Sequence, residues 1–334
     1  MRGTVLQIPD KYRQIVFIIL LILCIVFPME SAPNWQWYIN APVALLMGII
    51  TAIVMGNPFI KINKKATTYL LQISVVCLGF HLDVQHAMKA GQQGLLFTIA
   101  TIGLTLIAGY FIGRWLKIEP RTSFLISNGT AICGGSAIAA VAPIVKANDH
   151  EMSVSLGTVF ILNSIALIIF PAIGHMLALS AEQYGTWCAI AIHDTSSVVG
   201  AATNFKDALG HDALPIATAV KLERALWIIP ISLITAWHQK SKGKVKIPWF
   251  IFLFVVAIII SNYLPVSYKY DGKTLYDYLY VFGRKGLIIT LFLIGSGLSI
   301  NTIRQVGFRP ILQGVILWVL IGVLSLLAIR QIVV

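Results

Sequence analysis

The chain has 334 residues, of which 57% are hydrophobic and only 11% charged, and its mean hydropathy is +0.83. Soluble domains carry about 25% charged residues, so this sequence lacks the charge needed to cover a surface that faces water. The composition therefore excludes an ordinary soluble protein. It predicts an all-α, polytopic membrane protein.

Long apolar runs follow one another along the whole chain. A helix needs about 20 mostly apolar residues to cross a bilayer, and about ten or eleven runs approach this length. The runs are continuous rather than alternating, which favours helices over a barrel. We expect one integral membrane domain over residues 1–334. The candidate helices cover residues 14–27, 37–55, 67–82, 94–115, 122–145, 153–179, 186–202, 216–237, 249–264, 286–300 and 310–329.

The first apolar run follows three basic residues, Arg2, Lys11 and Arg13, and so resembles a signal peptide. No small-x-small cleavage site follows it, and we interpret it as a retained first helix rather than a cleaved leader. The four cysteines lie inside apolar runs, without the spacing of disulfide or metal-binding cysteines. We expect ordinary buried thiols and no metal site.

The formal net charge of +12 is concentrated in short loops between the apolar runs. This is the positive-inside pattern of a bacterial inner-membrane protein with a cytoplasmic N-terminus, and it argues against a nucleic-acid partner. Residues 180–185 do not fit, because alternation makes them cytoplasmic and they contain no basic residue. A re-entrant or broken segment within 122–202 would resolve this. The basic loop residues are Lys61, Lys64, Lys65, Arg114, Lys117, Arg121, Lys240, Lys242, Lys244, Lys246, Arg304 and Arg309.

The sequence contains two pairs of similar segments. Residues 78–91 align with residues 294–307 at a constant offset (294 − 78 = 216), within repeat-like segments 67–117 and 283–333. The loop charges give the two copies opposite directions, which is typical of the inverted repeats of secondary transporters. Chance similarity of two Gly- and Leu-rich helix ends is the alternative. A fainter pair, 134–140 and 194–200, has the same direction by simple alternation and does not fit an inverted scheme.

The first polar stretch interrupts a predicted membrane helix at 122–146, with the sequence Ser-Asn-Gly-Thr-Ala-Ile-Cys-Gly-Gly-Ser from residue 127. Two adjacent glycines weaken the helix, and exposed backbone groups persist in mid-membrane only where they line a cavity or are buried by protein. Positive half-helix N-termini at such a break suit an anion. Close helix packing through small residues is the alternative. The candidate substrate-binding residues here are Asn128, Gly129, Thr130, Gly134, Gly135 and Ser136.

The second polar stretch places His193 and Asp194 inside a predicted broken helix at 186–204. A carboxylate in mid-membrane marks an ion or proton pathway, and histidine relays protons near neutral pH. We expect these two residues to couple transport to an ion, with Na⁺ ligation by Asp194 as an open alternative. A helix cap at the membrane surface is the other interpretation. Three adjacent hydroxyl residues add candidate substrate contacts: Thr195, Ser196 and Ser197.

The third stretch places Lys221 and Arg224 three residues apart, so they share one helix face. Two buried cations on one face would form an anion site, whereas cations near a helix end would extend to water. Lys221 is alternatively a counter-ion for Asp194. A single polar residue in the apolar run 159–170, Asn163, is a candidate interhelical hydrogen-bonding or site residue.

Residues 127–140, 193–202 and 221–224, preceded by Leu-Gly-Phe-His-Leu at 78–82, resemble the YeiH-type family of bacterial membrane proteins, which are named as sulfate exporters. The family is distantly similar to bile acid:sodium symporters and sodium/proton antiporters. The resemblance implies inverted repeats, broken helices that cross in mid-membrane, and a homodimer. It also leads us to expect a small polar residue where this chain has Glu223. The additional carboxylate would neutralise part of the anion site.

We therefore expect a secondary transporter that moves a small anion, sulfate or a sulfonate, across the inner membrane in the export direction. The expected partners are that anion and the lipid bilayer, and no cofactor is expected beyond H⁺ or Na⁺ as a coupling ion. A transporter of an organic acid and a cation–proton antiporter are the first alternatives. An intramembrane enzyme is the second, but Ser196 and Ser197 lack the glycine-bounded turn of a nucleophile.

Overall fold

The computed structural model describes residues 9–27, 39, 41–203, 205–239, 249–264, 269, 273–297 and 306–332. Within that part of the chain the long regular elements are all helices, which confirms the all-α prediction. The residues pack as two compact units. The first unit contains residues 1–82 and 252–300, and the second contains residues 83–251 and 301–334.

Four helices among the described residues are long and apolar enough to cross a bilayer: Phe97–Trp115, Asp149–Met176, Leu275–Gly297 and Phe308–Ile332. Two shorter apolar helices, Val43–Val54 and Trp249–Tyr263, accompany them. Large apolar side chains such as Ile107, Phe111 and Val319 are exposed, as expected of surfaces that face lipid. These features support the polytopic membrane prediction.

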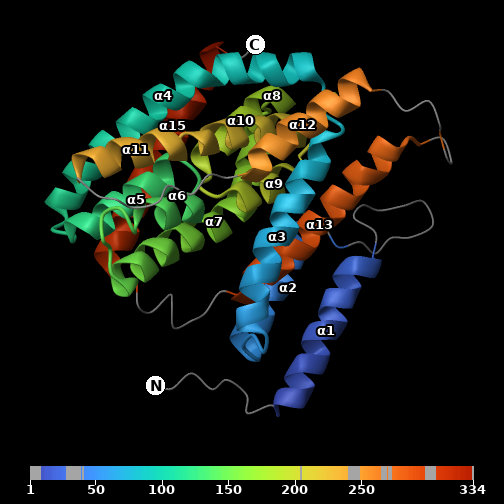
Figure 1. Cartoon of the computed structure of the whole chain (residues 1–334), viewed down its shortest axis with the longest axis horizontal. Coiled ribbons are helices and arrows are strands. Elements are labelled where there is room, and N and C mark those ends of the chain that lie inside the picture. Colours follow the sequence, from blue (N-terminus) through green and yellow to red (C-terminus); the bar gives the residue numbers. More distant parts are fainter. Residues whose placement is uncertain are drawn as a thin grey trace. The chain divides into compact units, whose positions relative to one another are not determined.

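The first unit is a bundle around α13 (Leu275–Gly297), which packs against α1 (Asp10–Val26), α2 (Ala41–Val54) and α3 (Ile60–Gly79). Figure 1 shows α3 and α13 lying side by side. The helices approach closely because glycines face one another, as at Gly48 of α2 and Gly295 of α13. Most of α12 (Trp249–Tyr263) belongs to the same unit.

A buried amide joins two helices of the first unit. Asn63 of α3 donates from Nδ2 to the carbonyl of Leu293, 2.9 Å away, and to Oγ of Ser296, 3.1 Å away, on α13. Such interhelical hydrogen bonds satisfy polar groups that lipid cannot. The repeat-like segments 67–117 and 283–333 each contain the end of one helix and the start of another. Residues 298–305 of the second segment lie outside the described residues, and inversion of this pair stays a prediction.

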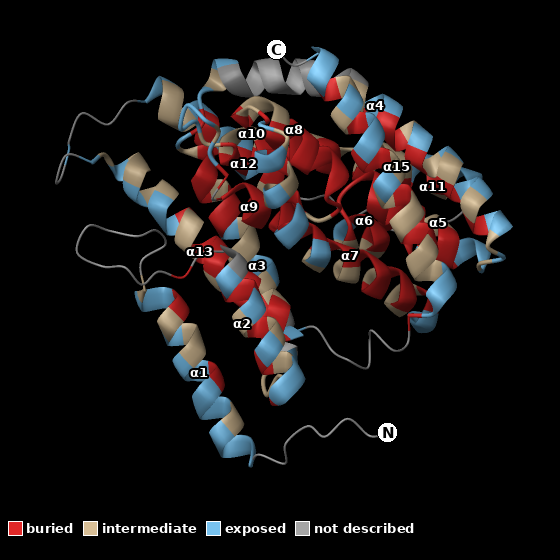
Figure 2. Cartoon of the chain, turned by 180° about the vertical axis from the view of Figure 1, so that it is seen from behind, coloured by how far each residue is buried: buried red, intermediate tan, exposed pale blue. Residues whose placement is uncertain are grey.

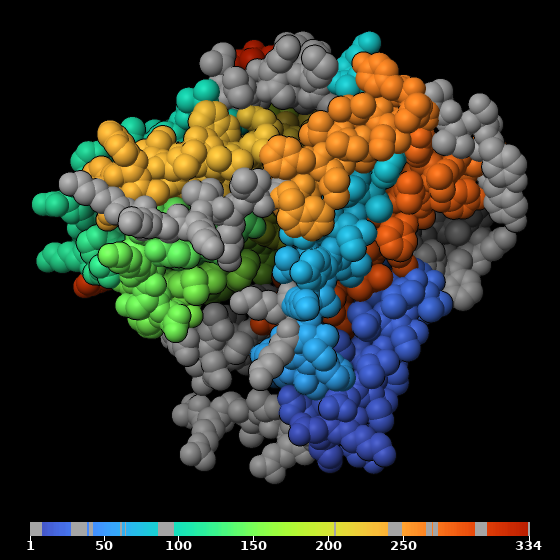
Figure 3. Space-filling view, viewed as in Figure 1, coloured from blue at the N-terminus to red at the C-terminus, as the bar shows by residue number. Residues whose placement is uncertain are grey.

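The second unit contains the polar stretches that the sequence singled out. Its helices are α4 (Val84–Trp115), α5 (Pro120–Ala131), α6 (Gly135–Val141), α7 (Asp149–Met176), α8 (Ala181–Ala191), α9 (Thr195–Ala202), α10 (Leu214–Leu226), α11 (Ile228–His238) and α15 (Phe308–Ile332). Figure 2 shows that α8 and α9 are buried almost throughout. In Figure 3, α11 in golden yellow forms part of the surface.

Helices α5 and α6 fold back on each other and form a hairpin, here called the first hairpin, with its tip at 132–134. Leu125 of α5 and Val141 and Val145, at and beyond the end of α6, lie in one buried cluster. A Cβ at Gly129 would lie 2.9 Å from Cδ1 of Ile138. These contacts pair residues at equal distances before and after the tip, as only an antiparallel hairpin can.

Helices α8 and α9 form a second hairpin with its tip at 192–194. Tyr184 Oη donates to the carbonyl of Ala201 at 3.2 Å, and Cys188 Sγ lies 3.7 Å from the carbonyl of Val198. The ring of Tyr184 also stacks on Phe205 with centroids 3.6 Å apart. The base of this hairpin therefore contains residues 180–185 together with 203 and 205–213.

Helix α7 runs along both hairpins in turn. Near its start, Ser155 Oγ donates to the carbonyl of Thr122 at the base of the first hairpin. Near its end, Gly174 contacts the Tyr184 ring at the base of the second hairpin. The 28 residues of α7 extend about 42 Å, so the bases lie at opposite ends of this helix and the tips meet near its middle.

Within the predicted broken segments 122–146 and 186–204, the helices are interrupted at 132–134 and at 192–194, and each segment folds back on itself. Each hairpin arm is too short to span a bilayer of about 30 Å, since α6 has 7 residues and α9 has 8. The faint echo between 134–140 and 194–200 now fits an opposed arrangement, because these segments begin the second arms of facing hairpins. The predicted helix 216–237 is likewise divided into α10 and α11, with Pro230 in the first turn of α11.

Candidate functional site

The two hairpin tips meet at Gly134 and Asp194. Gly134 has φ of +63°, which L-amino acids rarely adopt, so this position requires glycine. A Cβ added there would lie 3.2 Å from Cγ1 of Val159 on α7 and 3.3 Å from Cβ of Asp194. The glycine therefore both turns the chain between α5 and α6 and allows the tips to touch.

Lys221 of α10 joins the two tips. Its ammonium donates to the carbonyl of Ile132 at 3.0 Å in the first tip. It also donates to the carbonyls of Ala189 at 3.3 Å and Ile192 at 2.8 Å, at the end of α8. The side chain is 0% exposed. An ammonium has three donors, so these three acceptors satisfy it completely.

Arg224 lies one turn further along α10 and is also 0% exposed. Its Nη1 donates to Oγ1 of Thr101 on α4 at 2.7 Å, and its Nη2 donates to the carbonyl of Ala131 at the end of α5. Its Nε has no partner among the described residues. Glu223 faces α4 instead, where its carboxylate accepts from Oγ1 of Thr98 at 3.0 Å.

Asp194 is the N-cap of α9. Its Oδ2 accepts from the backbone N–H of Ser196 at 3.1 Å and from the hydroxyl of the same residue. This cap explains why α9 begins at Thr195. Among the described residues Asp194 and Lys221 form no ion pair, although both lie where the tips meet.

His193 is buried in the second tip, and its imidazole nitrogens contact no hydrogen-bond partner among the described residues. Its backbone N–H donates to Oδ1 of Asn163 on α7 at 3.1 Å, which leaves Nδ2 of Asn163 without a described partner. Two further buried atoms near the first tip, Oγ1 of Thr130 and Oδ1 of Asn128, also have no described hydrogen-bond partner. Buried polar atoms without partners are rare in folded proteins and point to groups that meet a ligand, ion or water.

The first hairpin is held from outside by α4 and α15. Gln313 of α15 donates from Nε2 to Oγ of Ser123 at 2.8 Å and to Oγ of Ser127 at 3.2 Å. The same two serines lie directly against Gly113 and Gly109 of α4, where no Cβ would fit. This packing fixes the position of α5 and leaves the tip residues facing α7 and α10.

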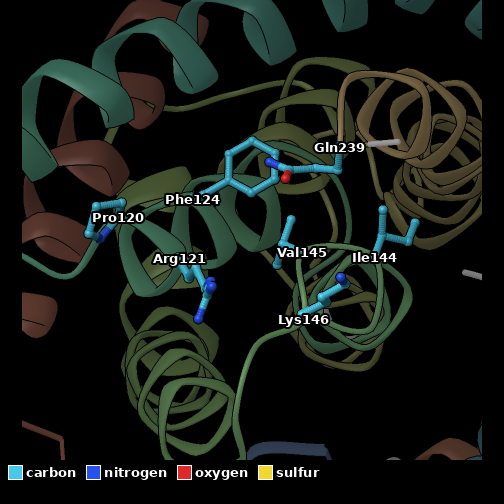
Figure 4. A pocket seen from close by; sticks show the side chains of 7 residues that line it. All are labelled: Pro120, Arg121, Phe124, Ile144, Val145, Lys146 and Gln239. Carbon is cyan, nitrogen blue, oxygen red and sulfur yellow. The ribbon is translucent and has the colours of Figure 1, made fainter. Parts of the chain in front are cut away.

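A cavity of about 330 Å³ opens at the base of the first hairpin (Figure 4). Arg121 and Phe124 of α5 line it together with Lys146, just beyond α6, and Gln239, just beyond α11. Figure 4 shows the charged ends of Arg121 and Lys146 at this cavity. Two cations at a cavity mouth raise the local concentration of anions.

The structure brings most of the predicted site residues together. Gly134 precedes α6, Gly135 and Ser136 begin it, and His193 to Ser197 form the second tip and the start of α9. Lys221 contacts both tips, whereas Arg224 contacts the end of α5 beside the first tip. Asn128, Gly129 and Thr130 lie in the last turn of α5, where Gly129 contacts Ile138 rather than the second hairpin. The roles predicted for these residues stay predictions.

Three residues near the site were not predicted to contribute to it. Thr98 and Thr101 on α4 contact the charged side chains of α10, and Gln313 holds the first hairpin. The only signal in the sequence is that each is a polar residue within an apolar run. That signal is shared by many residues, which is why it did not single these out.

These features define a polytopic, all-α membrane protein with two hairpins whose tips meet. The chain belongs to the family described as Conserved hypothetical protein 698, which it matches over residues 16–314. The predicted membership of the YeiH-type family is thereby confirmed.

Proteins named UPF0324 membrane protein are similar over most of their length. One from Bacteroides thetaiotaomicron is 52% identical over 294 residues, which is 87% of each chain. One from Porphyromonas gingivalis is 49% identical over 93% of each chain, and Bd1437 from Bdellovibrio bacteriovorus is 43% identical over 91% of this chain and 93% of its own. No solved structure matches the chain.

Proposed function

We propose that this protein is a secondary transporter that moves a small anion, sulfate or a sulfonate first, across the bacterial inner membrane. The observation that carries the proposal is the buried meeting point of two hairpins that enter from opposite ends of α7. Re-entrant or broken helices with ends near the membrane midplane are the usual construction of binding sites in secondary transporters. A protein with only a structural role has no need of buried charge at such a point.

The charges at the tips favour an anion accompanied by a proton. Lys221 and Arg224 contribute two positive charges, and Asp194 and Glu223 contribute two negative ones when ionised. A proton on one carboxylate leaves one excess positive charge, which a monovalent sulfonate would neutralise, and protons on both carboxylates leave two, which divalent sulfate would neutralise. Donors for its oxygens are available in Nε of Arg224 and Nδ2 of Asn163, which have no described partner. The proposed coupling ion is therefore H⁺.

The transport cycle follows from burial of the tips. Ile132, Cys133, Ile192 and His193 are all almost fully buried, so an anion reaches the site only when one hairpin moves away from the other. Opening of the first hairpin would connect the site to the basic cavity beside Arg121, and opening of the second to the opposite side. We propose that these openings alternate, with the basic cavity and the N-terminus on the cytoplasmic side.

Flux of radiolabelled sulfate in proteoliposomes tests the proposal. We expect saturable flux by the wild type that increases with a pH gradient. Flux should fall about tenfold or more in Arg224→Ala, because a hydrogen bond to a charged group contributes about 1.5–3 kcal/mol. Arg330→Ala is the matched control, since this arginine also donates to a carbonyl, that of Leu177, but is exposed at the end of α15.

If Asp194 carries the proton, a pH gradient should no longer accelerate flux by Asp194→Asn. Flux by Glu223→Gln, measured with and without the gradient, tests the second carboxylate in the same way. Sulfate flux absent under every gradient would exclude sulfate and direct the assay to sulfonates and organic acids. Absence of flux with all three anion classes would contradict the proposal.

We propose transport rather than catalysis as the role of this site. Ser196 donates its hydroxyl to Asp194, and among the described residues no serine contacts a nitrogen of His193. The nucleophile and base of a hydrolase would need that contact. We also propose that the transporter is a homodimer, which crosslinking in native membranes would test.

A further inference from the structure

The ammonium of Lys221 lies in a place that carbonyl oxygens alone define. Ile132 is the C-cap of α5 and Ile192 is the C-cap of α8, and Ala189 lies in the last turn of α8. Carbonyls at a helix C-terminus lack N–H partners within the helix and carry partial negative charge. Three of them, from two different hairpins, converge on one nitrogen at distances of 2.8 to 3.3 Å.

The break in the second hairpin makes one of these carbonyls available. In a continuous helix, the carbonyl of Ala189 would accept the N–H of His193, four residues later. That N–H instead donates to Oδ1 of Asn163. The carbonyl of Ala189 is thus free to accept from Lys221. The site for the ammonium is therefore a product of the hairpin tips, and not an incidental contact of a long side chain.

Carbonyl oxygens at half-helix ends are also what coordinates coupling cations in transporters with discontinuous helices. A free cation at such carbonyls exchanges with solvent, whereas the ammonium of Lys221 is covalently attached to α10 and stays at the site. We propose that Lys221 is a tethered substitute for a monovalent coupling cation, so that the wild-type protein needs no Na⁺ or K⁺ to assemble the two tips. Removing the side chain would then leave a site for a small monovalent cation.

Two other observations agree with this assignment. All three donors of Lys221 are occupied by carbonyls, so the residue contributes charge to the site but no free donor to an anion. Arg224, by contrast, retains Nε without a described partner. The two cations on one face of α10 therefore have different roles. Lys221 joins the two hairpin tips, and Nε of Arg224 is available to bind the substrate.

The test measures thermal stability of the purified protein and needs no knowledge of the substrate. Lys221→Ala is titrated with NaCl, KCl or methylammonium chloride, with choline chloride keeping the ionic strength constant. We expect the melting temperature of the variant to rise saturably, by roughly 2–4 °C at about ten times the Kd, with at least one small cation. The wild type should show no cation-specific rise.

Lys285→Ala is the matched control, because Lys285 of α13 also donates its ammonium to a carbonyl, that of Phe27, but to a single one among the described residues. It should show no cation-specific stabilisation. Absence of any such stabilisation in Lys221→Ala, or saturable stabilisation of the wild type by Na⁺ or K⁺, would overturn the inference.

A second measurement covers the case in which Lys221→Ala does not accumulate. Flux by the wild type should be unchanged when choline replaces Na⁺ and K⁺ on both sides of the membrane, and loss of flux on replacement would overturn the inference. This arm rests on the proposed function, whereas the thermal arm does not. If cations stabilise Lys221→Ala specifically but the wild type transports none of the anions, the proposed transport function is refuted, whereas the inference about Lys221 stands.

Discussion

Oδ1 of Asn163 on α7 lies 3.1 Å from the backbone nitrogen of His193 and accepts its hydrogen bond. This contact links α7, which runs past both hairpins, to the tip of the second hairpin. It also withdraws the N–H of His193 from α8, which ends the helix and exposes the carbonyl that Lys221 uses. One side-chain amide thus determines where α8 stops.

Asn163→Leu should destabilise the protein. Leucine cannot accept the N–H of His193, and a buried donor left without a partner costs about 1–3 kcal/mol. We expect a lower melting temperature in detergent. Ser164→Ala is the control, since among the described residues Oγ of Ser164 bonds only to the carbonyl of Phe160 within α7. Equal melting temperatures for Asn163→Leu and the wild type would show that the contact does not hold the tip.

Gly109→Ala and Gly113→Ala should each separate α4 from the first hairpin. A Cβ at either position would overlap the side chain of Ser127 or Ser123, and overpacking of this kind costs about 1–3 kcal/mol. Gly103→Ala on the same helix meets nothing within 4 Å and provides a control of equal chemistry. We expect a lower yield and a lower melting temperature for Gly109→Ala and Gly113→Ala than for Gly103→Ala. Alanine favours a helix more than glycine does, so Gly103→Ala should not lower the melting temperature, and a fall as large as in the other two variants would mean that overlap with the serines is not its cause.

The base of each hairpin should be labelled from one side of the membrane only. In a background without the four native cysteines, Arg121→Cys and Lys146→Cys flank the first hairpin, and Leu209→Cys lies at the base of the second. A membrane-impermeant thiol reagent should reach the first two from the same side and Leu209→Cys from the opposite side. Labelling of Arg121→Cys and Lys146→Cys from opposite sides would mean that α5 and α6 cross the membrane.

Asp207 at the base of the second hairpin should make stability depend on pH. Burial alone would raise the pKa of this carboxyl, but hydrogen bonds from the backbone N–H groups of His211, Ala181 and Leu209 lower the pKa to about 2. Because the pKa is lower in the folded state, the ionised carboxylate stabilises the protein above its ordinary pKa of 3.8. This stabilisation is lost as the pH falls from about 4 to about 2.

Melting temperatures of the wild type and Asp207→Asn, measured from pH 2 to pH 7, check this prediction. The wild type should be the more stable protein at pH 7, and the difference should shrink as the pH falls below about 4. A difference that stays constant over the whole range would mean that the charge of Asp207 has no part in stability.

The positions of the helix breaks could be predicted because they depend on residues near in sequence. Gly134 adopts a conformation that only glycine allows easily, and Pro230 cannot continue α10. The missing positive charge at 180–185 indicated a re-entrant or broken segment, and in the structure the break at 192–194 follows these residues. That both segments fold back could not be predicted, because the return path depends on contacts with α7 and α10 that are distant in sequence.

The contacts of the charged residues were harder to predict than their burial. Lys221 and Arg224 were placed correctly on one face of a helix, but their acceptors are carbonyls of α5 and α8. Any residue supplies a carbonyl, so no pattern of side chains marks such an acceptor. The role of Gln313 could not be predicted for a related reason, because its partners, Ser123 and Ser127, are far from it in the chain.

The shortness of the hairpin arms also constrains how the protein is made. Helix α6 has 7 residues, about 10 Å, and cannot be released into lipid alone with its backbone groups satisfied. The first hairpin therefore cannot reach its final depth before α7, α10 and α15 are available to enclose it. Since α15 begins at Phe308, 167 residues beyond the end of α6 at Val141 (308 − 141 = 167), the centre of the protein is completed only after that stretch has been made. A variant without α15 should expose the first hairpin to the quality-control proteases of the membrane.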